Sequence, residues 1–271
     1  MPFLRAGGPE LYYEVVGEGE PLVLVHGSWN DHTSWRPVIE ADLRASFRVL
    51  TYDRRGHGRS GAGPAPGTRR QDEDDLAALI ERLGPAPAHV AGNSFGAATA
   101  LGLAARRPEL LRTLTVHEPP LMAIVSGDPA AVAEMGAARA SIDAVLDLLR
   151  KGEHERGARL FVEEVAIGPG TWDGLPRRVR EAFAHNAPTF LDEQSDPDWA
   201  SLDLEGLSRC PVPVLLSGGT QSPAWLTTVL DHLAAALPRA RRQRLEGAGH
   251  IPHVTHPAQY VAALTRFARQ G

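Results

Sequence analysis

Short apolar segments that alternate with longer amphipathic segments constrain the fold of this chain most. Most of the apolar segments are hydrophobic throughout, as expected of strands in a parallel sheet that helices cover on both faces. Such an alternation is typical of an open α/β sheet with right-handed crossovers. Strands are predicted at 11–16, 21–27, 47–53, 88–94, 110–118, 212–218 and 242–247, and helices at 68–84, 95–107 and 256–270.

The alternation stops over one long segment. Roughly from Pro119 to Leu207 no core strand is predicted, whereas 131–152 and 175–186 have helical patterns. No internal repeat and no low-complexity linker sets this segment apart. We therefore expect one domain in which residues 1–118 and 208–271 form the core and residues 119–207 form a helical cap over the strand ends.

The composition argues against several classes of function. The net charge of -5 gives no reason to expect nucleic acid or an anionic membrane as a partner. No apolar segment approaches the ~20 residues that span a bilayer, and the N-terminal segment has no signal-peptide pattern. The single cysteine, Cys210, excludes an internal disulfide and a Cys-rich metal site. We expect a cytoplasmic monomer or homodimer without a cofactor.

The segment GNSFG, residues 92–96, matches the G-x-S-x-G pattern of a nucleophile elbow. It follows a predicted strand and precedes a predicted helix, which is the position that this motif requires. Its serine occupies a strained turn, so glycines must flank it to let the helix begin close to the strand. Ser94 is the predicted nucleophile, and the backbone N–H of Phe95 is a predicted oxyanion donor.

A second oxyanion donor is expected from the segment VLVHGSWND, residues 23–31. It is a strand that ends in His-Gly, so the next backbone N–H groups would lie beside the serine. Two such preorganised donors each contribute about 3–4 kcal/mol when tested by removal. Ser28 is the favoured donor, with Trp29 next to it. His26 is interpreted as a buried imidazole that braces the loop.

The predicted general base is His250, in the segment EGAGHIPHVTHP at 246–257. Glycines at 247 and 249 allow this loop to reach back over the carboxyl edge of the sheet. The three histidines here could also bind a metal by spacing alone, but no matching Cys or acidic cluster accompanies them. No metal is therefore expected, and His253 and His256 are interpreted as packing and helix-entry residues.

The motifs HGSW, YDRRGHGRS, GNSFG and GAGH, in this order, resemble the α/β-hydrolase fold superfamily across nearly the whole chain. The resemblance implies a mostly parallel eight-stranded sheet with helices on both faces and a helical cap inserted after the sixth strand. It also implies a nucleophile, an acid and a histidine in that chain order. YDRRGHGRS resembles the family's sharp turn after its fourth strand, in which Asp53 is a framework residue.

The acid departs from the pattern of many family members, which place it in a G-x-x-D turn after the seventh strand. Between Leu215 and Leu230 this sequence has no carboxylate, and Asp231 lies deep in the following helix. Glu118 at the end of strand 110–118 is the predicted acid instead. Pro119 is expected to hold Glu118 extended, and Pro120 to end the strand. This placement is similar to that of haloalkane dehalogenases and of lactone hydrolases of the zearalenone-opening type.

The nucleophile selects a reaction among these relatives. A serine alkoxide favours acyl carbonyls, which gives an acyl-enzyme that water hydrolyses. We therefore predict hydrolysis of a carboxylic ester or lactone of a small, largely apolar substrate. The alternatives are a non-hydrolytic small-molecule receptor on the same fold, or a perhydrolase, acyltransferase or C–C hydrolase that uses the same serine. A pocket is expected from large apolar residues of the oxyanion loop and the cap: Trp29, Met122, Trp172, Phe183 and Phe190.

Overall fold

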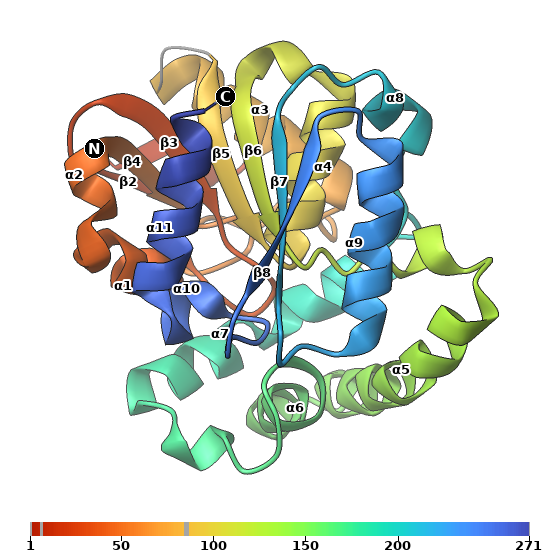
Figure 1. Ribbon diagram of the computed structural model, residues 1–271. Coiled ribbons are helices and arrows are strands. Elements are labelled where there is room, and N and C mark those ends of the chain that lie inside the picture. The colour runs from red at the N-terminus through yellow and green to blue at the C-terminus, as the bar shows by residue number, and fades with distance from the viewer. Residues whose placement is uncertain (1, 6–7, 84–86, 271) are drawn as a thin grey trace.

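The computed structural model describes residues 2–5, 8–83 and 87–270, and its strands form one sheet (Figure 1). The sheet has the order β1-β2-β4-β3-β5-β6-β7-β8. β1 and β2 pair antiparallel with their neighbours, and all other neighbours pair parallel, which confirms the predicted mostly parallel sheet. The strands are β1 Phe3–Arg5, β2 Glu10–Val16, β3 Glu20–Val25, β4 Phe47–Tyr52, β5 Ala88–Asn93, β6 Leu111–His117, β7 Val214–Gly219 and β8 Ala240–Leu245.

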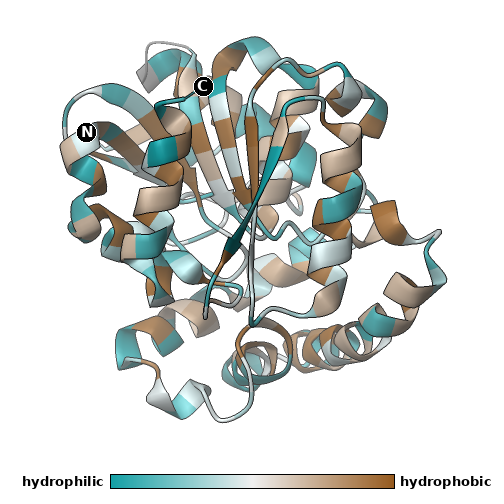
Figure 2. Ribbon diagram, viewed as in Figure 1, coloured by the Kyte–Doolittle hydropathy of each residue, from teal (hydrophilic) through white to brown (hydrophobic). Residues whose placement is uncertain are grey.

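Helices cover both faces of this sheet. Along β3 the side chains alternate, so that Val23 and Val25 join one apolar core and Leu22 and Leu24 join the other. The first core includes α3 Arg69–Leu83, α4 Phe95–Arg106 and α9 Ala224–Ala236, and the second includes α1 Arg36–Val38 and α11 Pro257–Ala268. Figure 2 shows hydrophobic residues along the central strands and mixed residues on the outer helices. Gly84, the predicted end of the helix 68–84, lies outside the described residues.

Most of residues 119–207 form helices beyond the carboxyl ends of the strands, whereas the end of this segment enters α8 Leu204–Ser208, which packs on α4 and α9 at the other end of the sheet (Figure 1). The longest are α5 Pro129–Arg150, α6 His154–Phe161 and α7 Arg177–Ser195, which pack against one another. The predicted helix 175–186 is too short, because α7 continues through Pro188 to Ser195. The apolar face of α7 is buried on both sides of this proline, at Phe183 and Phe190, and this packing outweighs the backbone hydrogen bond that proline removes.

Smaller elements complete the chain. They are α2 Arg44–Ser46, α8 Leu204–Ser208 and α10 Pro252–Thr255, with short 3-10 and π turns between helices. Of the helices in the described ranges, none is both long enough and apolar enough to cross a membrane. The carboxyl ends of β3, β5, β6 and β7 lie next to one another in the sheet, so the loops that follow these strands lie at the same edge of the sheet.

Candidate active site

Ser94 lies in the sharp turn between β5 and α4. Its backbone has φ 54° and ψ −124°, which is a strained conformation for a residue other than glycine. The flanking glycines permit this turn because side chains would collide there. A Cβ on Gly92 would lie 2.5 Å from the carbonyl oxygen of Gly96, and a Cβ on Gly96 would overlap the carbonyl oxygen of Val25. The local geometry is that of a nucleophile elbow.

One predicted oxyanion donor, Phe95, directly follows Ser94, and the other, Ser28, lies in the loop after β3. Phe95 is the first residue of α4, so its N–H has no partner within the helix. Ser28 follows Gly27, whose added Cβ would lie only 3.0 Å from the Cβ of Ser94. Ser28, Ser94 and Phe95 line one cavity. The loop after β3 therefore passes directly beside the elbow, as the sequence predicts.

His250 and Glu118 form a hydrogen-bonded pair at the same cavity. His250 Nδ1–H donates to Glu118 Oε2 over 2.8 Å, and the Gly219 N–H donates to Oε1 over 2.7 Å. Because Nδ1 is the donor, Nε2 of the neutral imidazole is left as a proton acceptor. Glu118 is only 1% exposed. Burial opposes its ionisation, but His117 and His250 beside it outweigh burial and hold the pKa of the carboxyl far below its usual range.

The backbone of Glu118 differs from the expectation. Its φ is 47°, so the expected extended conformation before Pro119 is wrong. The Glu118 N–H still donates to the Ser217 carbonyl over 3.3 Å, and its carboxylate is held by the two contacts described above. These tertiary hydrogen bonds override the local preference that a following proline imposes. Asp231, the other carboxylate considered, pairs instead with Arg242 over 2.8 Å and is mostly exposed.

Two residues that the sequence analysis did not identify hold the His250 loop. Asn93, directly before Ser94, donates from Nδ2 to the carbonyl oxygen of His250 over 2.8 Å. His117 contacts the carbonyl oxygen of Gly249 through Nε2 at 3.2 Å. Both residues adjoin predicted catalytic positions in sequence, at Ser94 and Glu118. Their positions next to predicted catalytic residues are visible in the sequence. The sequence does not show, however, that either side chain points toward the His250 loop.

The other histidines of the motifs are structural. His26 is fully buried, donates from Nδ1 to the Gly27 carbonyl over 2.8 Å and accepts the Arg54 N–H at Nε2 over 2.9 Å. Burial and the nearby Arg54 guanidinium lower the pKa of His26 to about 4. His253 packs on Trp35 with ring centroids 4.4 Å apart, and His256 stands at the N-cap of α11.

One group of side chains in the described part of the chain has metal-ligand chemistry. Asp31, His32 and Asp53 bring potential ligand atoms within 4.8 Å of one another. His32 Nδ1 and Asp53 Oδ1 are hydrogen bonded at 2.7 Å, and Asp31 Oδ1 accepts the Thr33 N–H over 2.7 Å. Asp53 Oδ2 also accepts the Arg59 N–H over 2.8 Å. These contacts hold the turn after β4 together, which is the framework role expected of Asp53.

The cavity next to Ser94 is small and mostly apolar. Its volume is about 60 Å³. Among the described residues that line it, none is Asp, Glu, Lys or Arg. They are Ser28, Ser94, Phe95, Pro120, Met122, Ile142, Phe161, Val165, Ala166, Phe190, Gln194, Trp199, Pro223, Trp225, Leu226 and His250.

Of the five predicted pocket residues, Met122 and Phe190 line this cavity, and Trp29, Trp172 and Phe183 do not. Trp29 is fully buried and stacks on Phe161, with ring centroids 4.9 Å apart. Trp172 packs edge-on against Phe183 at 6.4 Å. These three aromatic residues form the interior of the insertion and its contact with the core, because their large apolar surfaces are fully used in packing.

Comparisons with known proteins show the family and the fold of this chain. The model of the "Alpha/beta hydrolase family" matches residues 22–264. Pimeloyl-[acyl-carrier protein] methyl ester esterase of Chromobacterium violaceum is 29% identical over 94% of this chain and 96% of its own. An alpha/beta hydrolase of Sphaerobacter thermophilus superposes with a TM-score of 0.77 at 29% identity, covering 98% of this chain and 99% of its own.

The enol-lactonase of Burkholderia xenovorans superposes with a TM-score of 0.67 at 26% identity, covering 99% of this chain and 100% of its own. For two further relatives, this chain aligns with less than half of the relative's own length, 43% in one case and 49% in the other. The narrower likeness to zearalenone-opening enzymes stays a prediction. A family model that spans most of the chain, together with the sheet order and the elbow, places this chain in the alpha/beta hydrolase family.

Proposed function

We propose that this chain is a serine hydrolase that cleaves a carboxylic ester or lactone of a small, largely apolar substrate. The observation that carries the proposal is the pairing of His250 with Glu118 at the rim of an apolar cavity that Ser94 also lines. The arrangement has the parts of a serine triad: a strained, partly buried serine, an imidazole and a buried carboxylate that fixes its tautomer. Names of relatives, a methyl ester esterase and an enol-lactonase, support the same reaction class.

The reaction begins with attack of Ser94 Oγ on the acyl carbonyl carbon. His250 Nε2 accepts the serine proton, and Glu118 stabilises the imidazolium that forms. The backbone N–H groups of Ser28 and Phe95 bind the oxyanion of the tetrahedral intermediate. His250 then protonates the leaving alkoxide, which leaves Ser94 acylated. In a lactone the alkoxide remains tethered to the acyl group.

Deacylation repeats these steps with water. His250 Nε2 accepts a proton from water as its oxygen attacks the acyl carbonyl, and the same donors bind the second oxyanion. Collapse of this intermediate returns the proton to Ser94 Oγ and releases the carboxylic acid. The described residues that line the cavity are mostly apolar and include no Asp, Glu, Lys or Arg, which favours an uncharged acyl part in the substrate.

Residues 119–207 act in this proposal as the cap that selects the substrate. Met122, Phe161 and Phe190 come from this segment and form part of the cavity wall. A cavity of about 60 Å³ fits a short acyl chain better than a long one. We therefore expect turnover to be highest for short-chain esters and small lactones.

Covalent labelling tests the proposal directly. A fluorophosphonate should label the wild-type protein at one site and inactivate it toward a p-nitrophenyl ester series and a lactone panel. Ser94→Ala should abolish both labelling and turnover, while Ser208→Ala, an exposed serine at the end of α8, should change neither. Undiminished labelling or turnover in Ser94→Ala would rule out the serine mechanism.

A further inference from the structure

Helix α7 contacts the oxyanion loop, defined here as residues 27–30, through two polar side chains. Glu193 Oε2 accepts a hydrogen bond from Ser28 Oγ over 2.5 Å. Asn186 Nδ2 donates to the carbonyl oxygens of Trp29 and Asn30, over 3.2 Å and 3.1 Å. All these contacts join segments more than 150 residues apart in sequence. The oxyanion loop thus has hydrogen-bond partners in the insertion as well as in the core.

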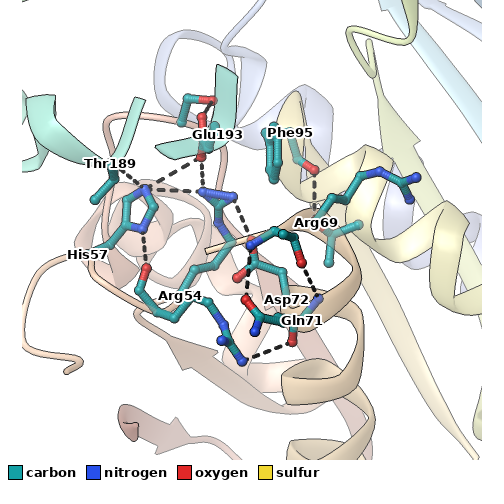
Figure 3. A network of polar contacts seen from close by, with 12 residues as sticks. Arg54, His57, Arg69, Gln71, Asp72, Phe95, Thr189 and Glu193 are labelled. Carbon is teal, nitrogen blue, oxygen red and sulfur yellow. Dashed lines mark hydrogen bonds and ion pairs between the residues drawn. The ribbon is translucent and has the colours of Figure 1, made fainter. Parts of the chain in front are cut away.

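Glu193 is anchored on its other side by Arg54 (Figure 3). Both side chains are buried, and the Arg54 guanidinium also pairs with Asp72 at 3.4 Å. The same guanidinium lies over the Phe95 ring, 4.6 Å from its centroid. Arg54 therefore contacts both the carboxylate that holds Ser28 and the side chain of the other predicted oxyanion donor, Phe95.

The oxyanion loop needs an external hold because its backbone is strained. Trp29 has φ 66°, a left-handed conformation that costs a residue other than glycine about 1–3 kcal/mol. The hydrogen bonds from α7 lie directly around this residue, at Ser28, Trp29 and Asn30. The Ser28–Glu193 hydrogen bond is charge-assisted when Glu193 is ionised, which makes it about twice as strong as a neutral one, so it and the two Asn186 bonds help to offset this strain.

We propose that Glu193 is a positioning residue, which holds Ser28 and the strained oxyanion loop in the conformation that binds the oxyanion. This inference rests on the proposed function, because it assigns a role to α7 in that same reaction. It also couples two events: when α7 moves away from the core, the Ser28 contact is lost and the oxyanion hole is disassembled. The enzyme is then fully active only while α7 is packed against the core.

The charges around Glu193 give the proposal a pH signature. Burial raises the pKa of Glu193 to about 7, against the attraction of Arg54 and the Ser28 hydrogen bond. His57 Nε2 lies 3.7 Å from Oε1, and Asp72 of α3 and Asp192 of α7 also act on this carboxyl. Only the ionised carboxylate attracts Arg54 as an ion pair. Protonation below neutrality therefore weakens the anchor of the oxyanion loop.

Kinetics of Glu193→Gln test the proposal. A loop displaced by about 1 Å lowers catalysis roughly 100-fold, so kcat for a short-chain p-nitrophenyl ester should fall about 10- to 100-fold with KM changed less than about threefold. Inhibition by an alkyl trifluoromethyl ketone, which mimics the oxyanion intermediate, should weaken by the same factor. The step near pH 7 in kcat that belongs to Glu193 should be absent from the variant.

Matched variants distinguish a role of Glu193 in positioning the oxyanion loop from a general loss of structure. Glu181→Gln removes an exposed carboxylate on the same helix, where it pairs with Arg177, and should leave kcat unchanged. Ser28→Ala removes the Ser28–Glu193 hydrogen bond and leaves the Arg54–Glu193 pair intact, whereas Glu193→Gln removes the carboxylate charge and leaves an amide oxygen that accepts more weakly. Both variants should lower kcat, and the losses should be less than additive in the double variant because they affect the same contact.

Two outcomes would overturn the inference. One is a folded Glu193→Gln or Ser28→Ala protein with wild-type kcat and wild-type affinity for the ketone. The other is additive losses in the double variant. Failure of the proposed function would look different, because Ser94→Ala would then retain turnover. A wild-type kcat in the Glu193 and Ser28 variants together with an inactive Ser94→Ala would leave the serine mechanism standing and remove only the role of α7.

Discussion

A carboxylate can serve a distant imidazole only if its backbone is held in place, and Glu118 shows how this chain does so. Its φ of 47° is unfavourable for glutamate, at a cost of about 1–3 kcal/mol. The hydrogen bonds from His250 and from the Gly219 N–H offset this cost. The Gly219 donor belongs to the end of β7, near which many relatives carry their acid. The longer glutamate side chain therefore reaches the same side of the imidazole from the neighbouring strand.

Glu118→Gln should lower kcat by about 10⁴ with the fold intact, because an amide in this place favours the wrong imidazole tautomer. Circular dichroism and thermal melting should show a folded protein, and steady-state kinetics with a p-nitrophenyl ester should show the loss. Glu109→Gln, an exposed carboxylate that pairs with Arg107, serves as the control with normal turnover. Turnover within a few fold of wild type in Glu118→Gln would remove this carboxylate from the mechanism.

The proximity of Ser94, Glu118 and His250 was predictable because each follows a strand whose place in the sheet can be read from the motif order. The backbone of Glu118 was not, since the local preference before proline points the other way. Trp29 was expected in the pocket, but its burial depends on three aromatic partners that α6 and α7 supply. Glu193 had no signal in the sequence, because its partners Ser28 and Arg54 are far away along the chain.

At the scale of elements, predictability follows length and periodicity. β1 has three residues and no apolar alternation, and the eight residues of α6 are fewer than the window of about 11–18 residues over which helical periodicity is judged. The long α5 was predicted within two residues at each end, at 131–152 against Pro129–Arg150. Which wall of the cavity each helix supplies depends on packing angles between helices, and these are not encoded in the pattern of any single helix.

Because α9 supplies part of the cavity wall, Trp225→Ala should enlarge the space for the acyl chain. Trp225 lines the cavity and is buried. We expect the preferred p-nitrophenyl ester to become longer by several carbons, measured as the kcat/KM profile over the ester series. Destabilisation of about 3–5 kcal/mol is expected as well, so kinetics should be measured well below the melting temperature.

Trp172→Ala is the matched control for this prediction. Trp172 is also buried but packs on Phe183 away from the cavity. Its replacement should destabilise the protein by a similar amount and leave the chain-length profile unchanged. The same shift in both variants would mean that loosening of the whole insertion, rather than the volume of the cavity, sets the preference.

Over the whole molecule, buried ionisable groups fall into two sets with opposite effects on stability. Burial raises the pKa of Asp75 and Glu193 to about 7, so their folded states bind protons more readily than the unfolded chain. Burial lowers the pKa of His26 to about 4 and that of His253 to about 3, which has the reverse effect. Between pH 5 and 6.5 the two sets partly cancel, so the stability of the wild-type protein alone does not reveal either of them.

His253→Phe isolates one member of these sets. Burial, together with the charges of His117, His250 and His26, lowers the pKa of His253 to about 3, against about 6.5 in the unfolded chain. Below pH 6.5 the unfolded state therefore binds a proton that the folded state does not, so His253 contributes a loss of stability as pH falls. The loss is about 1.4 kcal/mol per pH unit, or about 2 kcal/mol between pH 7 and pH 5.

The free energy of unfolding of His253→Phe, relative to that of the wild type, should therefore rise by about 2 kcal/mol when the pH is lowered from 7 to 5. The contributions of all other ionisable groups cancel in this difference. Urea unfolding at pH 7 and pH 5, followed by circular dichroism, measures it. Phe can pack on Trp35 as His253 does, and His253→Leu should show the same pH-dependent gain with a different constant offset. A difference from wild type that stays constant between the two pH values would mean that His253 accepts its proton inside the folded protein, and that its burial does not contribute to acid unfolding.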